Sequence, residues 1–132
     1  MPGELTSMKG SISYQEFRKE VLADYLLAHQ SRNLSLSGRK EVLTGKAKFG
    51  IFGDGKEVAQ IAMAKTFRKG DWRSGYYRDQ TFMLATGMFS LVEFFSQLYG
   101  VADTQYNPGN GGRSFNNHFS TRNINENGNL VD

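Results

Sequence analysis

Three short sequence patterns favour a fold that is built mainly from helices. In each pattern a serine or an aspartate is followed three residues later by a glutamate: Ser13 and Glu16, Asp54 and Glu57, and Ser90 and Glu93. Such a pair caps the start of a helix, because the two side chains satisfy backbone amides that have no partner in the first turn. An apolar segment follows each pair, so the sequence predicts three helix starts.

The predicted helices cover about residues 14–30, 57–68, 79–86 and 90–100. In the first, the apolar residues Tyr14, Phe17, Val21 and Tyr25 recur at helical spacing. The others end at glycines, which adopt the left-handed backbone that often closes a helix. Residues 31–45 lose the period and carry serine, glycine and arginine. They are therefore predicted to form an irregular connection with one short turn at 39–43.

The chain lacks the alternation of strands and helices that builds a complete doubly wound domain. The one strand candidate, residues 48–52, is weakened by glycines. Residues 1–12 are predicted to be a flexible N-terminus and residues 13–100 a helical unit. Residues 101–132 hold eight asparagines and four glycines, which favours a loop region without a core of its own.

Composition excludes several classes of protein. Of the residues, 39% are hydrophobic and 13% aromatic, which is enough for a packed core. The net charge of +3 is too small and too dispersed to indicate a nucleic-acid-binding face. The absence of cysteine excludes a disulfide framework and a thiolate metal site. The polar N-terminus and the lack of a long apolar stretch predict a cytoplasmic protein that neither enters nor binds a membrane.

Gly53-Asp54-Gly55 is the first candidate site, because this triplet resembles the start of the metal-diphosphate motif of thiamine enzymes. That motif also needs an asparagine 25 to 30 residues later, and the window at 80–88 contains none. We therefore interpret Asp54 as a helix cap. The glycine-rich run at 109–113 is a second candidate, since successive glycines expose amides that can cradle phosphate, but such runs are usually simple turns.

The run Tyr76-Tyr77-Arg78-Asp79-Gln80 is the third candidate. It precedes a predicted helix, where free amides favour an anion, and the guanidinium of Arg78 can bind phosphate oxygens strongly. Tyr77 adds a hydroxyl donor. The residues alone also allow Arg78 to pair with Asp79 or Asp71 at the surface, which is the more common arrangement.

The two histidines lie 89 positions apart and have no partners at metal-ligand spacing, so no metal site is predicted. His29 lies near the end of the first predicted helix, where its expected role is capping. His118 lies in a polar irregular region with Arg113, Asn116 and Asn117, and either a site or a plain surface position fits it.

Four segments occur in an order and at a spacing that resemble a known family. They read GKEVAQIAMAKTFRKGDW, GDWRSGYYRDQTFMLATGM, FFSQLYG and GNGGRSFNNHF. From about residue 20 onward the chain resembles the α subunit, or the α-type half of a fused α/β chain, of the thiamine-diphosphate-dependent decarboxylating component of 2-oxoacid dehydrogenases. The branched-chain and pyruvate types are both similar. The resemblance implies a mainly α-helical, N-terminal fragment of an α/β thiamine-diphosphate-binding fold, with an incomplete parallel sheet and a domain truncated at residue 132.

The resemblance also implies a site and partners. Tyr77 and Arg78, preceded by Tyr76, match the Tyr-Arg pair that holds the cofactor diphosphate in the family, and His118 matches a histidine near the cofactor entrance. The implied cofactors are thiamine diphosphate and magnesium, although the metal motif is absent from this chain. The implied partners are a β-type subunit or half, a lipoyl-bearing acyltransferase component and a small 2-oxo acid. A hetero-oligomer is expected, and the isolated chain is expected to be inactive.

Two other functions remain open at the level of sequence. A free-standing helical protein-interaction module would use its apolar helix faces to bind a partner and would fold cooperatively alone. Binding to nucleic acid rests only on the basic pI of 9.2 and is the weakest alternative.

Overall fold

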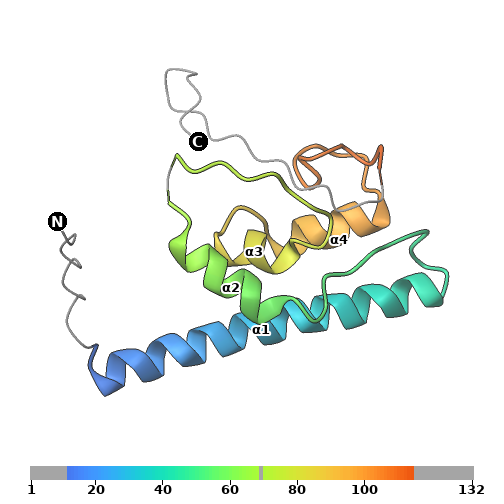
Figure 1. Ribbon diagram of the computed structural model, residues 1–132. Helices are drawn as coiled ribbons and strands as arrows, with labels where there is room; N and C mark the ends of the chain where they lie inside the picture. The colour runs from blue at the N-terminus through green and yellow to red at the C-terminus, as the bar shows by residue number, and fades with distance from the viewer. Residues whose placement is uncertain (1–11, 69, 115–132) are drawn as a thin grey trace.

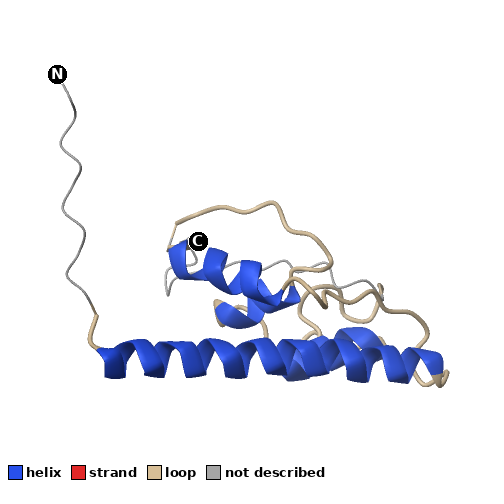
Figure 2. Cartoon of the chain, turned by 60° about the horizontal axis from the view of Figure 1, so that its bottom comes forward, coloured by secondary structure: helices blue, strands red, loops and turns tan. Residues whose placement is uncertain are grey.

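The computed structural model describes residues 12–68 and 70–114, which form four helices. Their bounds are Tyr14–Leu43 for α1, Glu57–Thr66 for α2, Gln80–Ala85 for α3 and Leu91–Tyr99 for α4. No strand occurs within these two ranges, and the prediction of a mainly helical chain is confirmed. α1 is one long rod, and the three shorter helices lie against one side of it (Figure 1). Figure 2 shows that loops make all the connections.

α1 is much longer than the sequence predicted. The segment 31–45, expected to be irregular, continues the helix as far as Leu43. Its buried residues are Ser31, Leu34, Ser35 and Gly38, which recur at helical spacing. Small side chains on that face allow α3 and the 44–56 loop to approach closely. Most residues that recur at helical spacing here are small rather than hydrophobic. A search for apolar periodicity therefore does not detect this part of the helix.

Gly38 shows how tightly this face is packed. A methyl group added at Gly38 would lie 2.4 Å from Cε1 of Phe52. We expect Gly38→Ala to destabilise the fold by about 1 kcal/mol net, because a repacking cost of about 1–3 kcal/mol exceeds the gain in helix propensity. Urea unfolding is the measurement, and Ser37→Ala on the exposed face of the same helix is the control. Equal or greater stability of Gly38→Ala would contradict the packing.

The hydrophobic core lies between α1 and the shorter helices. Phe82 and Phe94, one on α3 and one on α4, are both fully buried. The other buried residues of this cluster are Leu34, Ala47, Met83, Phe89 and Leu98. Phe67 meets Phe82 edge to face, with 5.1 Å between ring centroids. α3 contacts both α1 and α2. The segment that leads into α3 therefore lies close to both of these helices.

The predicted capping boxes at two of the three sites are confirmed. Ser13 accepts a hydrogen bond from the amide of Glu16, and Ser90 accepts one from the amide of Glu93. The carboxylate of each glutamate in turn accepts a hydrogen bond from the backbone amide of its serine. Gly100 ends α4 in the left-handed conformation, with φ of 66°. Local sequence therefore determines these helix ends without help from the rest of the fold.

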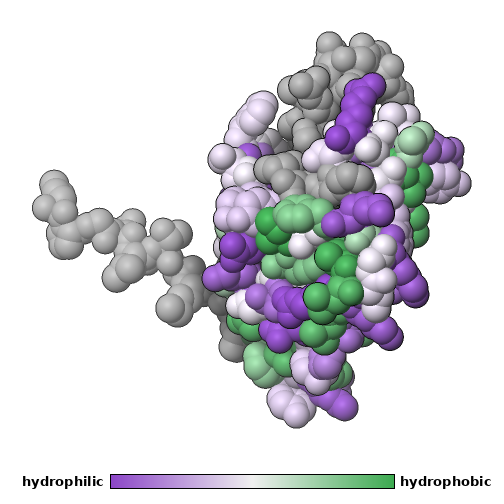
Figure 3. All heavy atoms as spheres, turned by 90° about the vertical axis from the view of Figure 1, so that its right-hand side faces the viewer, coloured by the Kyte–Doolittle hydropathy of each residue, from purple (hydrophilic) through white to green (hydrophobic). Residues whose placement is uncertain are grey.

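The first half of α1 carries an apolar face that the described residues leave uncovered. We call it the α1 stripe; its members are Tyr14, Phe17, Val21, Leu22, Tyr25 and Leu26, each at least 45% exposed. α2 approaches a different side of this half-helix, where Lys65 forms ion pairs with Glu20 and Asp24. In Figure 3, which shows the face at the other end of α1, apolar side chains also gather among hydrophilic ones. Among the described helices, none is long and apolar enough to cross a membrane.

Candidate functional site

The segment Tyr76–Asp79 leads into α3 and places Arg78 just before the helix. Asp79 occupies the N-cap position just before the helix, but its side chain makes no capping bond to it. Its carboxylate instead accepts hydrogen bonds from the amide of Tyr76 at 2.8 Å and from Nη1 of Arg73 at 2.6 Å. Asp79 is therefore already paired with an arginine other than Arg78.

Arg78 lies against two tyrosine rings rather than against a carboxylate. Its guanidinium carbon is 5.7 Å from the ring centroid of Tyr76 and 5.4 Å from that of Tyr77. Nη2 of Arg78 lies 3.5 Å from the Tyr77 hydroxyl, which also accepts a 2.6 Å hydrogen bond from the Tyr76 hydroxyl. Nε of Arg78 is buried and has no hydrogen-bond partner among the described residues. The surface pair with Asp79 or Asp71 does not form.

Electrostatics within this cluster polarise the two hydroxyls in opposite directions. The hydrogen bond between the tyrosines raises the pKa of Tyr76, which donates its proton, and lowers the pKa of Tyr77, which accepts it. The nearby Arg78 guanidinium also lowers the pKa of Tyr77. The tyrosines in turn raise the pKa of Arg78 above its already high value. The cluster therefore presents a permanent positive charge beside polarised hydroxyl groups.

Gln80 anchors the same segment to α1 from inside the protein. Its side chain is fully buried, and its Nε2 donates to the Ser31 carbonyl at 2.9 Å and to Oγ of Ser35 at 2.8 Å. Its Oε1 accepts from the amide of Gly53 at 3.2 Å. A methyl group on Gly53 would lie 2.4 Å from the carbonyl oxygen of Arg78. Gly53 thus allows its loop to touch the backbone that carries Arg78.

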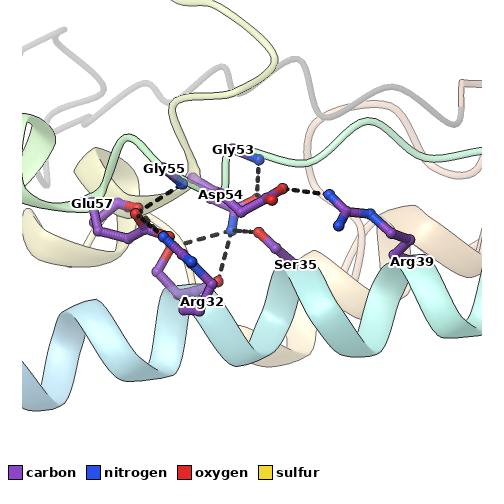
Figure 4. Close-up of polar contacts among 10 residues, drawn as sticks. Arg32, Ser35, Arg39, Gly53, Asp54, Gly55 and Glu57 are labelled. Carbon is purple, nitrogen blue, oxygen red and sulfur yellow. Dashed lines mark hydrogen bonds and ion pairs between the residues drawn. The ribbon is translucent and has the colours of Figure 1, made fainter.

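The Gly53–Gly55 loop is held by arginines of α1, and the expected cap by Asp54 is wrong. α2 begins at Glu57, and Lys56 occupies the N-cap position without a side-chain capping bond. Asp54 accepts instead from Arg39 at 2.7 Å (Figure 4). Glu57 is buried and binds Arg32 through both oxygens, at 2.6 and 3.0 Å. The amide of Gly55 also donates to Glu57. Long-range ion pairs have replaced the local capping box here, and hydrogen bonding from Arg32 lowers the pKa of Glu57.

The glycine-rich loop at 109–113 closes on itself. Oδ1 of Asn110 accepts from the amides of Gly112 at 2.9 Å and Ser114 at 3.4 Å, as well as from the side chain of Asn107. Gly112 has φ of 81° and lies so close to the Gly100 carbonyl that a methyl group would be 2.7 Å from it. Amides that would cradle a phosphate are used inside the loop, which favours a simple turn.

The two histidines have different outcomes. His29 lies in the middle of the lengthened α1, where its Nε2 shares a 2.8 Å hydrogen bond with the Tyr25 hydroxyl. Its expected role as a C-terminal cap is therefore wrong, because the helix continues for more than three turns beyond it. His118 lies outside the described residues. Within those residues, no group of three or more histidine, aspartate and glutamate side chains is placed to hold a metal ion.

Comparison with known families identifies the chain. The family model described as "Dehydrogenase E1 component" matches residues 29–131, which is most of the sequence. The chain belongs to this family. Dehydrogenase E1 components are thiamine-diphosphate-dependent parts of 2-oxoacid dehydrogenases. Searches for similar curated proteins and for similar solved structures gave no significant match.

The family match includes every helix of this E1 chain except the first half of α1. It therefore covers Arg78 and its tyrosines, Gln80, and the arginine-bound loop at 53–55. Sequence analysis selected Tyr76, Tyr77 and Arg78 but did not predict the ion pair of Arg32 with Glu57 or the buried anchoring role of Gln80. These contacts join residues far apart in the chain, so no local pattern reveals them.

Proposed function

We propose that the chain is the α-type part of a 2-oxoacid dehydrogenase E1 component of the branched-chain or pyruvate type, and that Arg78, Tyr77 and Tyr76 bind the diphosphate of its thiamine cofactor. The observation that supports this best is the state of Arg78. Its charge has no carboxylate partner among the described residues, and its Nε is buried without a hydrogen-bond partner among them. The rings of Tyr76 and Tyr77 lie beside its guanidinium. A diphosphate oxygen would supply the missing acceptor.

The residues present fit a diphosphate in chemistry as well as in charge. The planar guanidinium offers several donors in a fixed fork, which matches phosphate oxygens better than an ammonium group does. The hydroxyl of Tyr77 is a further polar group beside it. α3 has only six residues, so Arg78 rather than a helix terminus must supply most of the attraction.

Within the proposed enzyme the chain would hold and orient the cofactor rather than carry out the chemistry. Thiamine diphosphate, when bound, supplies the carbanion and electron sink that the decarboxylation of a 2-oxo acid requires. Arg78 would neutralise diphosphate charge, and the tyrosines would restrict the guanidinium to one plane. His118 is proposed to lie near the cofactor entrance, and magnesium to be bound by residues outside this chain.

The partners of the proposed enzyme are a β-type subunit or half and a lipoyl-bearing acyltransferase component, which receives the acyl group from the 2-oxo acid. The α1 stripe supports a hetero-oligomer, because an exposed apolar face of this extent favours contact with another protein surface. The same stripe would suit a free-standing interaction module, but such a module gives no reason for an Arg78 guanidinium without a carboxylate partner among the described residues. A cytoplasmic location is part of the proposal.

Replacement of Arg78 tests the proposed site. In the full-length protein assembled with its partner, Arg78→Ala is expected to weaken thiamine-diphosphate binding about tenfold to a hundredfold, the range of a charged hydrogen bond. Arg78→Lys should recover only part of the affinity, because an ammonium cannot bind two phosphate oxygens in one plane. Calorimetric titration in the presence of magnesium measures both.

Arg68→Ala is the matched control, since Arg68 is an exposed arginine just after α2 and away from the α1 stripe. It removes the same charge from the chain and should leave the affinity unchanged. Unchanged affinity in Arg78→Ala, or equal losses in the two variants, would show that Arg78 does not bind the cofactor.

A further inference from the structure

α3 begins without a capping side chain of its own. The amides in the first turn of a helix have no partner within it, and a capping residue normally satisfies one of them. Asp79 occupies the capping position, but its carboxylate is engaged by Tyr76 and Arg73. Another part of the protein must therefore satisfy the first turn of α3.

Gln60 of α2 supplies the missing cap from a neighbouring helix. Its Oε1 accepts a 3.0 Å hydrogen bond from the amide of Phe82, the third residue of α3. Its Nε2 donates a 2.9 Å hydrogen bond to the carbonyl oxygen of Arg78. One carboxamide, only 9% exposed, thus joins the two ends of the turn that runs from Arg78 into the helix.

The bond from Gln60 leaves the backbone of Arg78 little room to move. The carbonyl oxygen of Arg78 accepts a hydrogen bond from Nε2 of Gln60. It also lies so close to Gly53 that a methyl group added at Gly53 would be only 2.4 Å away. Two residues later, Gln80 ties the chain to α1. Only the side chain of Arg78 keeps its freedom, and the rings of Tyr76 and Tyr77 reduce that freedom further.

We propose that Gln60 is a positioning residue that fixes the backbone of Arg78 so that its guanidinium is preorganised for the cofactor diphosphate. This inference rests on the proposed function of Arg78. A charge that is already oriented loses less conformational entropy on binding, so the restraint raises affinity without any contact between Gln60 and the ligand.

A glutamine suits this position better than its closest relatives. It carries a donor and an acceptor on one planar group, and both are used here. A glutamate would keep the acceptor for Phe82 but would turn an oxygen toward the Arg78 carbonyl, where two acceptors repel. Its negative charge would also compete with a diphosphate for the guanidinium. A methionine of similar shape would leave both backbone groups without partners.

A double-mutant cycle in thiamine-diphosphate binding tests the inference. The proteins are wild type, Gln60→Met, Arg78→Ala and the double variant, each as the full-length protein assembled with its partner, and titrated with thiamine diphosphate and magnesium by calorimetry. We expect Gln60→Met to weaken binding about fivefold to tenfold in the wild-type background, which corresponds to one lost hydrogen-bond restraint. In the Arg78→Ala background it should have no further effect, because Gln60 acts through Arg78.

Thr81→Val is the matched control. Thr81 is fully buried and its hydroxyl pairs with Oγ of Ser31 at 2.6 Å, so this variant also removes a buried polar contact between helices without touching the Arg78 carbonyl. It should bind the cofactor as wild type does. Hydrogen exchange supplies an independent readout: the amide of Phe82 should exchange faster in Gln60→Met than in Thr81→Val.

The outcomes separate this inference from the proposed function. Unchanged affinity in Gln60→Met together with a loss in Arg78→Ala would overturn the positioning role and leave the diphosphate site standing. Equal losses from Gln60→Met in both backgrounds would overturn it as well, since they would indicate general destabilisation. Unchanged affinity in Arg78→Ala would remove the proposed site and the inference together. If Gln60→Met does not fold, Gln60→Asn takes its place in the cycle with the same expected pattern, because its shorter carboxamide adds no charge but cannot reach both backbone groups.

Discussion

Gln80→Leu is expected to lower the free energy of unfolding by about 3 kcal/mol, since a buried polar group that loses its partner costs about 1–3 kcal/mol and several lose theirs at once. The Gly53 amide and the Ser35 hydroxyl are the groups most affected, because Gln80 is their partner inside the protein. Leucine fills a similar volume, so the loss arises from hydrogen bonds rather than from a cavity. Urea unfolding followed by circular dichroism measures the change.

Gln97→Leu is the matched control for this prediction. Gln97 is also a buried glutamine, with 1% of its surface exposed, but its Oε1 has no hydrogen-bond partner among the described residues. The same substitution there should cost less than about 1 kcal/mol, because little hydrogen bonding is lost. Equal costs at the two positions would contradict the role of Gln80 as the anchor between α1, α3 and the Gly53 loop.

Glu57→Gln is expected to destabilise the protein by about 2 kcal/mol at pH 7, within the range of a charge-assisted hydrogen bond. Glu57 is buried, and hydrogen bonding from Arg32 lowers its pKa in the folded protein. A lowered carboxyl pKa means that ionised Glu57 stabilises the fold above its ordinary pKa of about 4.3. This contribution is lost as the pH falls through the folded-state pKa, because the protonated group no longer pairs with Arg32.

The difference in stability between wild type and Glu57→Gln should therefore be largest at neutral pH and should shrink below about pH 4. Unfolding experiments from pH 3 to pH 7 measure it. Arg32→Gln should show the same pH window, since removing the cation returns the pKa of Glu57 toward its ordinary value. A difference that stays constant over this range would show that the ion pair does not hold the 53–57 segment.

The parts of the fold that local chemistry determines could be predicted from the sequence. Ser13, Ser90 and Gly100 mark helix ends through contacts within three or four residues, and the structure confirms all three. The capping role of Asp54 had the same local pattern but was wrong. Arg39, fifteen residues away, is a stronger partner for that carboxylate than the amides of the first turn of α2.

The second half of α1 could not be predicted, because its helical period is carried by small and polar residues. Ser31, Ser35 and Gly38 favour turns when considered alone. In the folded protein they form the face against which Gln80 and Phe52 pack. Tertiary packing has therefore overridden low helix propensity over about three turns.

Tyr76, Tyr77 and Arg78 were selected from the sequence, and their role in cofactor binding stays a prediction. The contacts that hold these residues in place could not be predicted. The Tyr-Arg pair stands out by its resemblance to a family, whereas residue chemistry alone favours a surface ion pair for Arg78. The structure shows why that pair does not form: Asp79 binds Arg73, and Asp71 accepts from the amide of Arg68. Gln60 bonds the carbonyl of Arg78, and Gln80 anchors the chain two residues later. Neither role could be predicted, because the partners of these side chains lie far away in the chain.

The most direct test of the central claim is an experimental structure of the full-length protein, assembled with its partner and bound to thiamine diphosphate and magnesium. The proposed function predicts a diphosphate oxygen within hydrogen-bond distance of the Arg78 guanidinium, with the carboxamide of Gln60 still bonded to the Arg78 carbonyl. A diphosphate bound elsewhere, with Arg78 still resting on Tyr76 and Tyr77 and making no contact with it, would contradict the proposed function.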